Sequence, residues 1–295
     1  MVDTEGRRGS GSADPGPLGV IAGNGNLPAE LVAAVRATGR PVVLVAIRGE
    51  SDPALDGLGA RWVEWGQVGK LFGVLRREGV HDIVLIGGVA KRPDFKSVVS
   101  DFETLKRLPR ILSTMIGGDD SVLTRVLRLV EDEGFRILGA QDVAPGLLAG
   151  IGVLGRERPG ERDERDIRLC RAVITALGPY DVGQAAVAMD GRVVAIEAAE
   201  GTDAMLARVT EARAARRISA KGTVGVLVKG PKPGQDLRVD LPTIGRKTID
   251  AVKAAGLAGI AVEAGRVLIA DRAATIAAAD QAGLFLIGYK VGRAD

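Results

Sequence analysis

Short apolar runs alternate with segments of helical period along the first half of the chain. The first unit consists of a strand at 18–22, a glycine-rich turn at 23–28 and a helix with Pro28 in its first turn. Strands that alternate with helices in this way build a parallel sheet with helices on both faces. The pattern therefore predicts an α/β fold whose N-terminal part is a Rossmann-like parallel sheet domain.

The same alternation continues to residue 150. Further strands are expected at 42–47, 82–88 and 135–142, and helices at 67–79, 95–115 and 121–134. Asp119 and Asp120 precede the last of these helices, and we interpret them as N-caps more readily than as metal ligands. His81 precedes a strand and is interpreted as a structural residue.

The second half has a different pattern, in which β-rich runs are joined by tight turns. One hairpin is expected around Asp190-Gly191 and a second around Gly265. Helices are expected at 166–178, 202–216, 243–256 and 272–283, and strands at 224–230 and 284–289. The predicted organisation is a disordered tail at 1–17, a Rossmann-like domain at 18–150, a charged linker at 151–166 and a distinct C-terminal α/β domain with hairpins at 167–295.

The amino-acid composition excludes several kinds of binding and catalytic site. The 295 residues carry a net charge of +3, spread along the chain, and only two Trp, two Tyr and five Phe. Nucleic-acid-binding proteins usually gather basic residues in a patch with stacking aromatics, so no nucleic-acid partner is expected. A single cysteine, Cys170, excludes an internal disulfide and a cysteine-rich zinc site. With one histidine, catalysis must rely mainly on carboxylates, Lys, Arg and backbone groups.

No segment has the length of a membrane span. The most membrane-like stretch, 143–155, has 13 residues and is interrupted by Pro and Gly, whereas a spanning helix needs about 20. Residues 1–17 lack the apolar core of a secretion signal. The sequence therefore predicts a cytoplasmic protein.

The glycine-rich turn after the first strand is a candidate substrate-binding loop. Gly23, Asn24 and Gly25 precede a helix, where backbone N–H groups favour an anion, but an ordinary tight turn explains the same residues equally well. The loop lacks the third glycine of the dinucleotide fingerprint. This departure disfavours a nicotinamide-dependent dehydrogenase.

A second glycine loop follows another predicted parallel strand. Gly87 and Gly88 allow a close ligand approach, and Lys91 and Arg92 suit a phosphate. A surface loop with solvated charges is the alternative interpretation.

The densest polar signal follows the strand that ends at Lys229. The loop after it contains Lys232, Asp240 and Thr243 and is punctuated by prolines. Ordered polar loops on α/β scaffolds often carry catalytic and binding residues. Thr243 also suits a helix N-cap, and an anion can share such a helix terminus.

Acidic residues upstream of that loop suggest a metal. Glu200 and Asp203 stand at the start of a predicted helix, where the helix dipole already favours them. Together with Asp240 they would supply the oxygen ligands that Mg²⁺ prefers. Carboxylates that face Lys229 and Lys232 across a cleft describe a metal-assisted phosphoryl or pyrophosphate site.

Six motifs then carry a family resemblance. In chain order they are LGVIAGNGNLP, GGVAKRP, Gly-Asp-Asp at 118–120, AIEAAEGTDAML, VKGPKPGQDLRVDLPTIG and GLAGIAVEAG. In these motifs the chain resembles the LpxI-type UDP-2,3-diacylglucosamine pyrophosphatases of lipid A biosynthesis. The resemblance covers nearly everything from residue 18 to residue 289.

The resemblance implies a magnesium-dependent hydrolase that cleaves UDP-2,3-diacylglucosamine to UMP and 2,3-diacylglucosamine 1-phosphate (lipid X), with the lipid bound between two domains. It also implies that Asp240 is the functionally essential aspartate. Because the substrate is a lipid-linked sugar nucleotide, we expect a transient, peripheral contact with the inner-membrane surface. The sequence leaves the oligomeric state open, a homodimer included.

Two other functions remain open at this stage. One is a nucleotide-dependent oxidoreductase that uses the N-terminal sheet, and tight NADH or NADPH binding would favour it. The other is a non-catalytic protein that binds a sugar nucleotide or a lipid phosphate, and failure to release UMP with Mg²⁺ present would favour that one.

Overall fold

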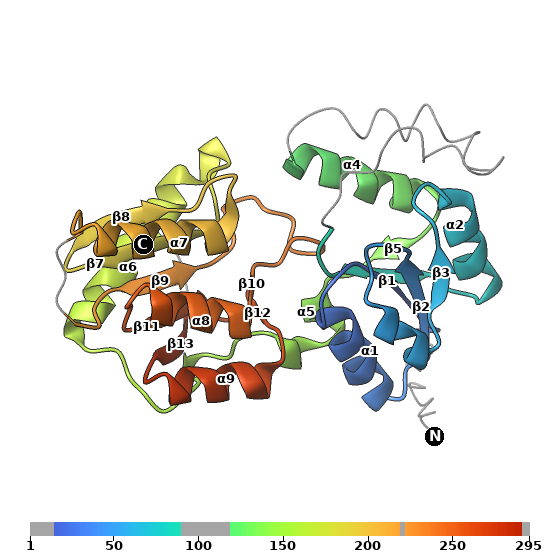
Figure 1. The fold of residues 1–295 in the computed structure, drawn as a ribbon. Coiled ribbons are helices and arrows are strands. Elements are labelled where there is room, and N and C mark those ends of the chain that lie inside the picture. The colour runs from blue at the N-terminus through green and yellow to red at the C-terminus, as the bar shows by residue number, and fades with distance from the viewer. Residues whose placement is uncertain (1–14, 90–118, 219–221, 291–295) are drawn as a thin grey trace, which may run out of the picture.

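The computed structural model describes residues 15–89, 119–218 and 222–290. Figure 1 shows two α/β units, one built on each half of the chain. The expected helix at 95–115, Lys91 and Arg92 lie outside the described residues, as does most of the tail that was expected to be disordered. No helix among the described residues is long and apolar enough to cross a bilayer.

The N-terminal unit contains the expected parallel sheet. Its strands are β1 (Leu18–Ala22), β2 (Val42–Ile47), β3 (Arg61–Val63), β4 (Asp82–Ile86) and β5 (Arg136–Ile137), in the order β3-β2-β1-β4-β5. Its helices are α1 (Leu27–Ala37), α2 (Val68–Arg77), α4 (Asp119–Asp132) and α5 (Ala140–Val143). Alternate side chains of β1 enter two cores, because Val20 packs on the α1 side and Ile21 on the α2 and α4 side. This is the Rossmann-like arrangement that the alternating pattern predicts.

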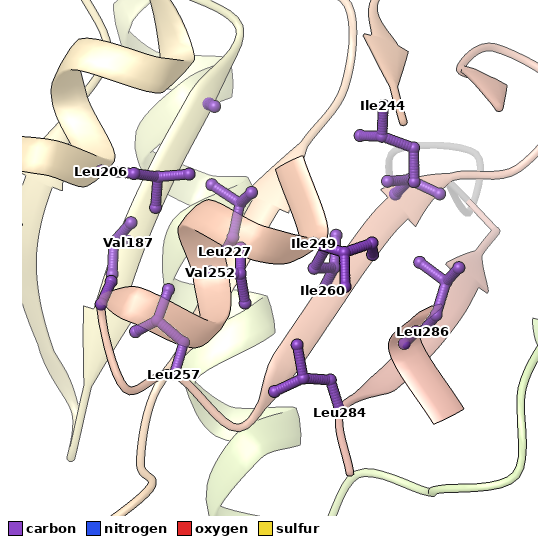
Figure 2. Packing of buried hydrophobic residues seen from close by; sticks show 14 of the residues in the cluster. Val187, Leu206, Leu227, Ile244, Ile249, Val252, Leu257, Ile260, Leu284 and Leu286 are labelled. Carbon is purple, nitrogen blue, oxygen red and sulfur yellow. The ribbon is translucent and has the colours of Figure 1, made fainter. Parts of the chain in front are cut away.

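The C-terminal unit is built on a separate mixed sheet. Its strands are β6 (Gly152–Val153), β7 (Ala185–Met189), β8 (Arg192–Ile196), β9 (Val226–Lys229), β11 (Gly259–Glu263) and β13 (Phe285–Tyr289), in the order β6-β13-β11-β9-β7-β8. Helices α7 (Gly201–Ala214), α8 (Arg246–Ala254) and α9 (Arg272–Gln281) cover one face, and α6 (Glu161–Leu177) covers the other. Figure 2 shows the apolar core between this sheet and helices α7, α8 and α9. The hairpin of β7 and β8 at Asp190-Gly191 is confirmed.

The second expected hairpin, around Gly265, is wrong. The strand that follows this glycine, β12 (Leu268–Ile269), pairs in parallel with β10 (Thr243–Ile244) instead of returning along β11. The physical reason is that β11 already has β9 on one edge and β13 on the other, so it has no free edge. Glu263, at the end of β11, is consequently buried.

The expected linker at 151–166 is structured over much of its length. Its first part, β6, pairs with β13, and its last part is the beginning of α6. The charged run forms a helix because its acidic residues suit a helix N-terminus, and Asp163 accepts a hydrogen bond from the Gly160 N–H at 2.9 Å. Similarly, the strand expected at 135–142 ends at Ile137, and α5 follows.

Direct contacts join the two units. Leu268 of β12 packs into the N-terminal core, and Leu148 forms a β-bridge with it. Arg272 at the start of α9 donates a hydrogen bond to the Leu148 carbonyl at 2.8 Å, and the Asp271 N–H donates to Glu30 of α1 at 2.9 Å. The C-terminal unit is therefore held against the α1 side of the N-terminal sheet.

A buried carboxylate holds together the amino ends of strands in the N-terminal sheet. Asp82, at the amino end of β4, accepts hydrogen bonds from Arg136 at 2.7 and 2.9 Å and from Arg40 at 2.7 Å. The Arg136 hydrogen bond, helped by Arg40 and opposed by desolvation, keeps the pKa of Asp82 below its usual range. These contacts tie the amino ends of β2, β4 and β5 together.

We predict that Asp82→Asn lowers the free energy of unfolding at neutral pH by about 1–3 kcal/mol, less than for a fully buried pair because Arg136 is largely exposed. Because folding lowers the pKa of Asp82, its stabilisation is present above the unfolded value of about 3.9 and is lost as pH falls through the folded value. Urea titrations at several pH values measure this loss. Glu78→Gln, which breaks an exposed pair with Arg61, is the control and should change stability little; equal effects of the two variants would contradict the prediction.

Candidate functional site

A buried lysine lies at the carboxyl end of the central strand of the C-terminal sheet. Lys229 is the last residue of β9, between β7 and β11, and only 9% of it is exposed. Its Nζ donates a hydrogen bond to Thr202 Oγ1 at 2.8 Å, and that hydroxyl donates to Glu197 Oε2 at 3.1 Å. The ammonium is thereby linked through a hydroxyl to a carboxylate at the end of β8.

Burial dominates the electrostatics of this lysine. Desolvation lowers the pKa of Lys229, while the carboxylates of Glu197, Asp203 and Asp240 act in the opposite direction. Asp203 comes from the first turn of α7, and Asp240 comes from the loop between β9 and β10. Two segments distant in sequence, 197–203 and the loop that contains Asp240, therefore bring three carboxylates to one amine.

The carboxylate of Asp240 is oriented by two amides. Gln235 donates from Nε2 to the Asp240 carboxylate and, at 2.8 Å, to the Asp240 main-chain carbonyl. Gln184 donates from Nε2 to Asp240 Oδ2 at 3.3 Å. Gln184 precedes β7 and Gln235 lies in the same loop as Asp240, so the C-terminal unit provides both donors.

The other charged residues expected in the site have partners elsewhere. Glu200, the N-cap residue of α7, forms an ion pair with Arg208, about two turns further along the same helix. The pKa of Glu200 is lowered, mainly by a hydrogen bond from its own backbone N–H and further by Arg208. Desolvation of the carboxylate acts in the opposite direction. Lys232 forms an ion pair with Asp181.

Thr243 does not cap the following helix. It lies in β10, and its hydroxyl donates to the Leu241 carbonyl at 3.3 Å. The N-cap of α8 is Gly245, whose N–H donates to Thr248 Oγ1. The helix begins three residues later than expected, at Arg246, because β10 extends the chain through Ile244.

The two N-terminal glycine loops lie against each other. The N–H of Asn24 donates to the Gly88 carbonyl at 2.7 Å, and the Gly88 N–H donates to the Asn24 carbonyl at 3.1 Å. A Cβ on Gly23 would lie 2.3 Å from the Gly88 carbonyl oxygen, and one on Gly87 would lie 2.7 Å from the Asn24 carbonyl oxygen. Close packing of the loops after β1 and β4 therefore requires these glycines. Gly25 has a positive φ of 87° and open space beside it.

The loops nevertheless occupy the place where open α/β sheets bind ligands. Strand order reverses between β1 and β4, and ligands of such sheets bind outside the carboxyl ends of the strands at this point. A cavity of about 360 Å³ adjoins Gly25 and Asn26 and reaches Asp271 and Arg272 of the C-terminal unit. Its charged lining is mainly acidic, with Glu30, Asp52 and Asp271 against Arg272, which does not suit a diphosphate.

A preformed metal cage is not among the described residues, because no group of three or more His, Cys, Asp or Glu side chains converges there. Glu200, Asp203 and Asp240 do not form one, and Glu200 is held by Arg208. Mg²⁺, however, usually keeps several waters and binds through one or two carboxylates plus substrate phosphates. Asp240 and Asp203 beside Lys229 fit that simpler mode.

Sequence reasoning found the charges of the site but missed their polar partners. Thr202 lies in the AIEAAEGTDAML motif beside the acidic residues Glu197, Glu200 and Asp203, so its place in that motif was the signal that could have found it. Gln184 and Gln235 carry no charge and stand in no pattern of their own. Only the folded chain shows that both amides face Asp240.

Comparison with known proteins identifies the family of the chain. Residues 17–147 match the family described as LpxI N-terminal domain, and residues 150–287 match LpxI C-terminal domain. The chain is also 46% identical over 271 residues to UDP-2,3-diacylglucosamine pyrophosphatase LpxI of Caulobacter vibrioides, which covers 92% of this chain and 96% of the relative. The chain belongs to the LpxI family. As an LpxI family member it has both family domains, and the buried lysine and Asp240 lie in the C-terminal one.

We predict that Lys229→Met leaves the midpoint of thermal unfolding unchanged or raises it. Burying a charged ammonium opposes folding, and replacing a buried charge by an apolar side chain of similar size is often neutral or stabilising. Because folding lowers the pKa of Lys229, the penalty is full below the folded pKa and is relieved as pH rises towards about 10.4. Calorimetry across this pH range measures the change in the unfolding midpoint and its sign. Lys253→Met, at an exposed position, is the control. A marked drop in the midpoint would show that the hydrogen bond to Thr202 and the attraction of the nearby carboxylates make Lys229 stabilise the fold.

Proposed function

We propose that the chain hydrolyses the pyrophosphate bond of UDP-2,3-diacylglucosamine to give UMP and 2,3-diacylglucosamine 1-phosphate in lipid A biosynthesis. The observation that carries the proposal is the 46% identity, over nearly the whole of both chains, to an LpxI relative of that name. The cluster of Lys229 and Asp240 supports it, because hydrolysis of a phosphoanhydride needs positive charge and an oriented water rather than a histidine or a thiol. Family membership likewise favours the hydrolase over an oxidoreductase.

In the proposed reaction a water oxygen forms a bond to one phosphorus, and the bond from that phosphorus to the bridging oxygen breaks. Asp240 orients the water as a hydrogen-bond acceptor, with its carboxylate held by Gln184 and Gln235. Lys229 neutralises charge on the phosphate oxygens. Its ammonium has three N–H donors, and the hydrogen bond to Thr202 uses one of them. Lys232 and Thr243 lie in the same loop region, and Lys232 must leave Asp181 to reach a phosphate.

Charge balance supports a role for Mg²⁺. The carboxylates of Glu197, Asp203 and Asp240 all act on Lys229, so the cluster is net negative before an anionic diphosphate arrives. Like charges repel strongly in a partly desolvated site, and a divalent cation would offset this. We propose that Asp240 and Asp203 hold the ion together with substrate phosphates. Glu200 would have to release Arg208 to join them.

The substrate also implies where the enzyme works. A diacylated sugar nucleotide carries its acyl chains in a membrane, and no described helix of this chain could span one. We propose that the protein takes its substrate from the inner-membrane surface by a transient peripheral contact. The diphosphate would then lie at Lys229 and Asp240, and the sugar would lie towards the glycine loops that contain Gly23, Asn24, Gly25, Gly87 and Gly88.

Asp240→Asn should reduce UMP release at least 10³-fold, because it removes the negative charge that orients water and holds the cation. EDTA should abolish wild-type activity, and added Mg²⁺ should restore it. The assay follows UMP and lipid X from UDP-2,3-diacylglucosamine by mass spectrometry. Asp250→Asn, at an exposed position of α8, is the matched control and should retain activity. Full activity of Asp240→Asn would refute the assigned role, and substrate binding without any UMP from the wild type would favour the non-catalytic binding protein.

Removing the amide that orients Asp240 should reduce turnover without comparable loss of binding. We expect Gln235→Leu to lower kcat about 10- to 100-fold, because misplacing a catalytic group by about 1 Å has effects of this size, with a much smaller change in KM. Gln281→Leu, at the exposed end of α9, is the control. An equal rise in KM at constant kcat would instead show that Gln235 binds substrate.

A further inference from the structure

The loop that carries Asp240 belongs to both units of the molecule. It leaves the C-terminal sheet at Lys229, the end of β9, and returns at β10, and Figure 1 shows this segment reaching the N-terminal unit. Val239 packs against the core on the α2 and α4 side of the N-terminal sheet, and Leu241 packs against the core on the α1 side. The neighbours of Asp240 on both sides are therefore anchored in the N-terminal unit.

The Asp240 side chain is held from the other direction. Gln184 and Gln235 fix its carboxylate, and Gln184 is part of the C-terminal unit, just ahead of β7. Backbone anchors in one unit and side-chain anchors in the other mean that the position of this carboxylate depends on how the two units are packed.

One charged contact joins the same loop to a helix of the N-terminal unit. Arg238 donates from Nη1 to Glu131 Oε1 of α4 at 2.7 Å. Its Nη2 and Nε donate to Asp236 at 2.7 and 3.0 Å, and the Val239 and Asp240 N–H groups both donate to the Asp236 carbonyl. The guanidinium thus connects α4 to the turn that presents Asp240.

This contact contributes little to overall stability. Both side chains of the Arg238–Glu131 pair are more than a third exposed, and exposed pairs add little to the free energy of folding. A planar guanidinium that contacts both Glu131 and Asp236 instead fixes the orientation of the loop relative to α4, which a flexible ammonium would not do. These observations fit a role of the Arg238–Glu131 pair in positioning the loop better than a role in stabilising the fold.

We infer that Glu131 and Arg238 are interdomain positioning residues that fix the Asp240 loop against α4, and so couple the packing of the two units to the placement of the carboxylate. The kinetic part of this inference rests on the proposed function, whereas the structural part does not. Neither residue touches the reacting atoms in this scheme. Their effect is exerted through the loop.

The kinetic test uses the full-length chain with UDP-2,3-diacylglucosamine and Mg²⁺. Glu131→Gln and Arg238→Gln should each lower kcat about tenfold with a smaller change in KM. The double variant should lose no more than Arg238→Gln alone, because that single variant already breaks the contact with Glu131 together with the hydrogen bonds to Asp236. Arg238→Lys should recover only part of the loss. Effects that add in the double variant, or a change confined to KM, would overturn the inference.

The matched control is Glu133→Gln. Glu133 follows α4 closely and pairs with Arg76 inside the N-terminal unit, so the substitution removes the same charge without touching the Asp240 loop. It should leave kcat near the wild-type value. If Glu131→Gln and Glu133→Gln behave alike, the contact has no positioning role.

An activity-independent measurement separates this inference from the proposed function. Hydrogen–deuterium exchange of peptides covering 230–242 should be faster in Glu131→Gln and Arg238→Gln than in the wild type, and unchanged in Glu133→Gln. If exchange is faster in the two variants but the wild type releases no UMP, the structural part of the inference is supported and the proposed reaction is refuted. Unchanged exchange in both variants would overturn the contact even if the enzyme is active.

Discussion

A charged ammonium buried at the end of a central strand is the constraint on which the site depends. Lys229 is buried and its Nζ contacts Thr202 of α7, so its polar end must find partners where it lies. Thr202 accepts its hydrogen bond and Glu197 orients that hydroxyl. Removing a charge from water makes it interact more strongly with its neighbours, and this is why the carboxylates of Asp203 and Asp240 matter at this position.

The two ends of the N-terminal sheet are held together by different interactions. Its amino end is joined by Asp82 and two arginines, a network far along the strands from the loops after β1 and β4. At the carboxyl end the glycines of those loops permit main-chain hydrogen bonds across the point where strand order reverses.

Much of the fold could be predicted from local pattern, whereas the hairpin expected at Gly265 fails because of strand pairing that local pattern does not show. The strands β1 and β2 begin and end where the apolar runs do, and the hairpin at Asp190-Gly191 follows from its turn residues. The turn at Gly265 carries a similar signal but forms no hairpin, because β11 has two partners already. The same limit applies to the site: Lys229 and Asp240 are visible as charges, whereas the orienting amides depend on tertiary contacts.

Asp240 illustrates how a two-unit architecture makes a site conditional. A C-terminal unit alone would retain Lys229, Thr202 and Glu197, because all three arise from its own sheet and helix. It would expose Val239 and Leu241, whose apolar contacts lie in the N-terminal cores. Exposure of two apolar side chains favours rearrangement of a short polar loop, since burial is the main force that fixes it. The buried cation is therefore a property of one unit, and the placement of the carboxylate opposite it is a property of both.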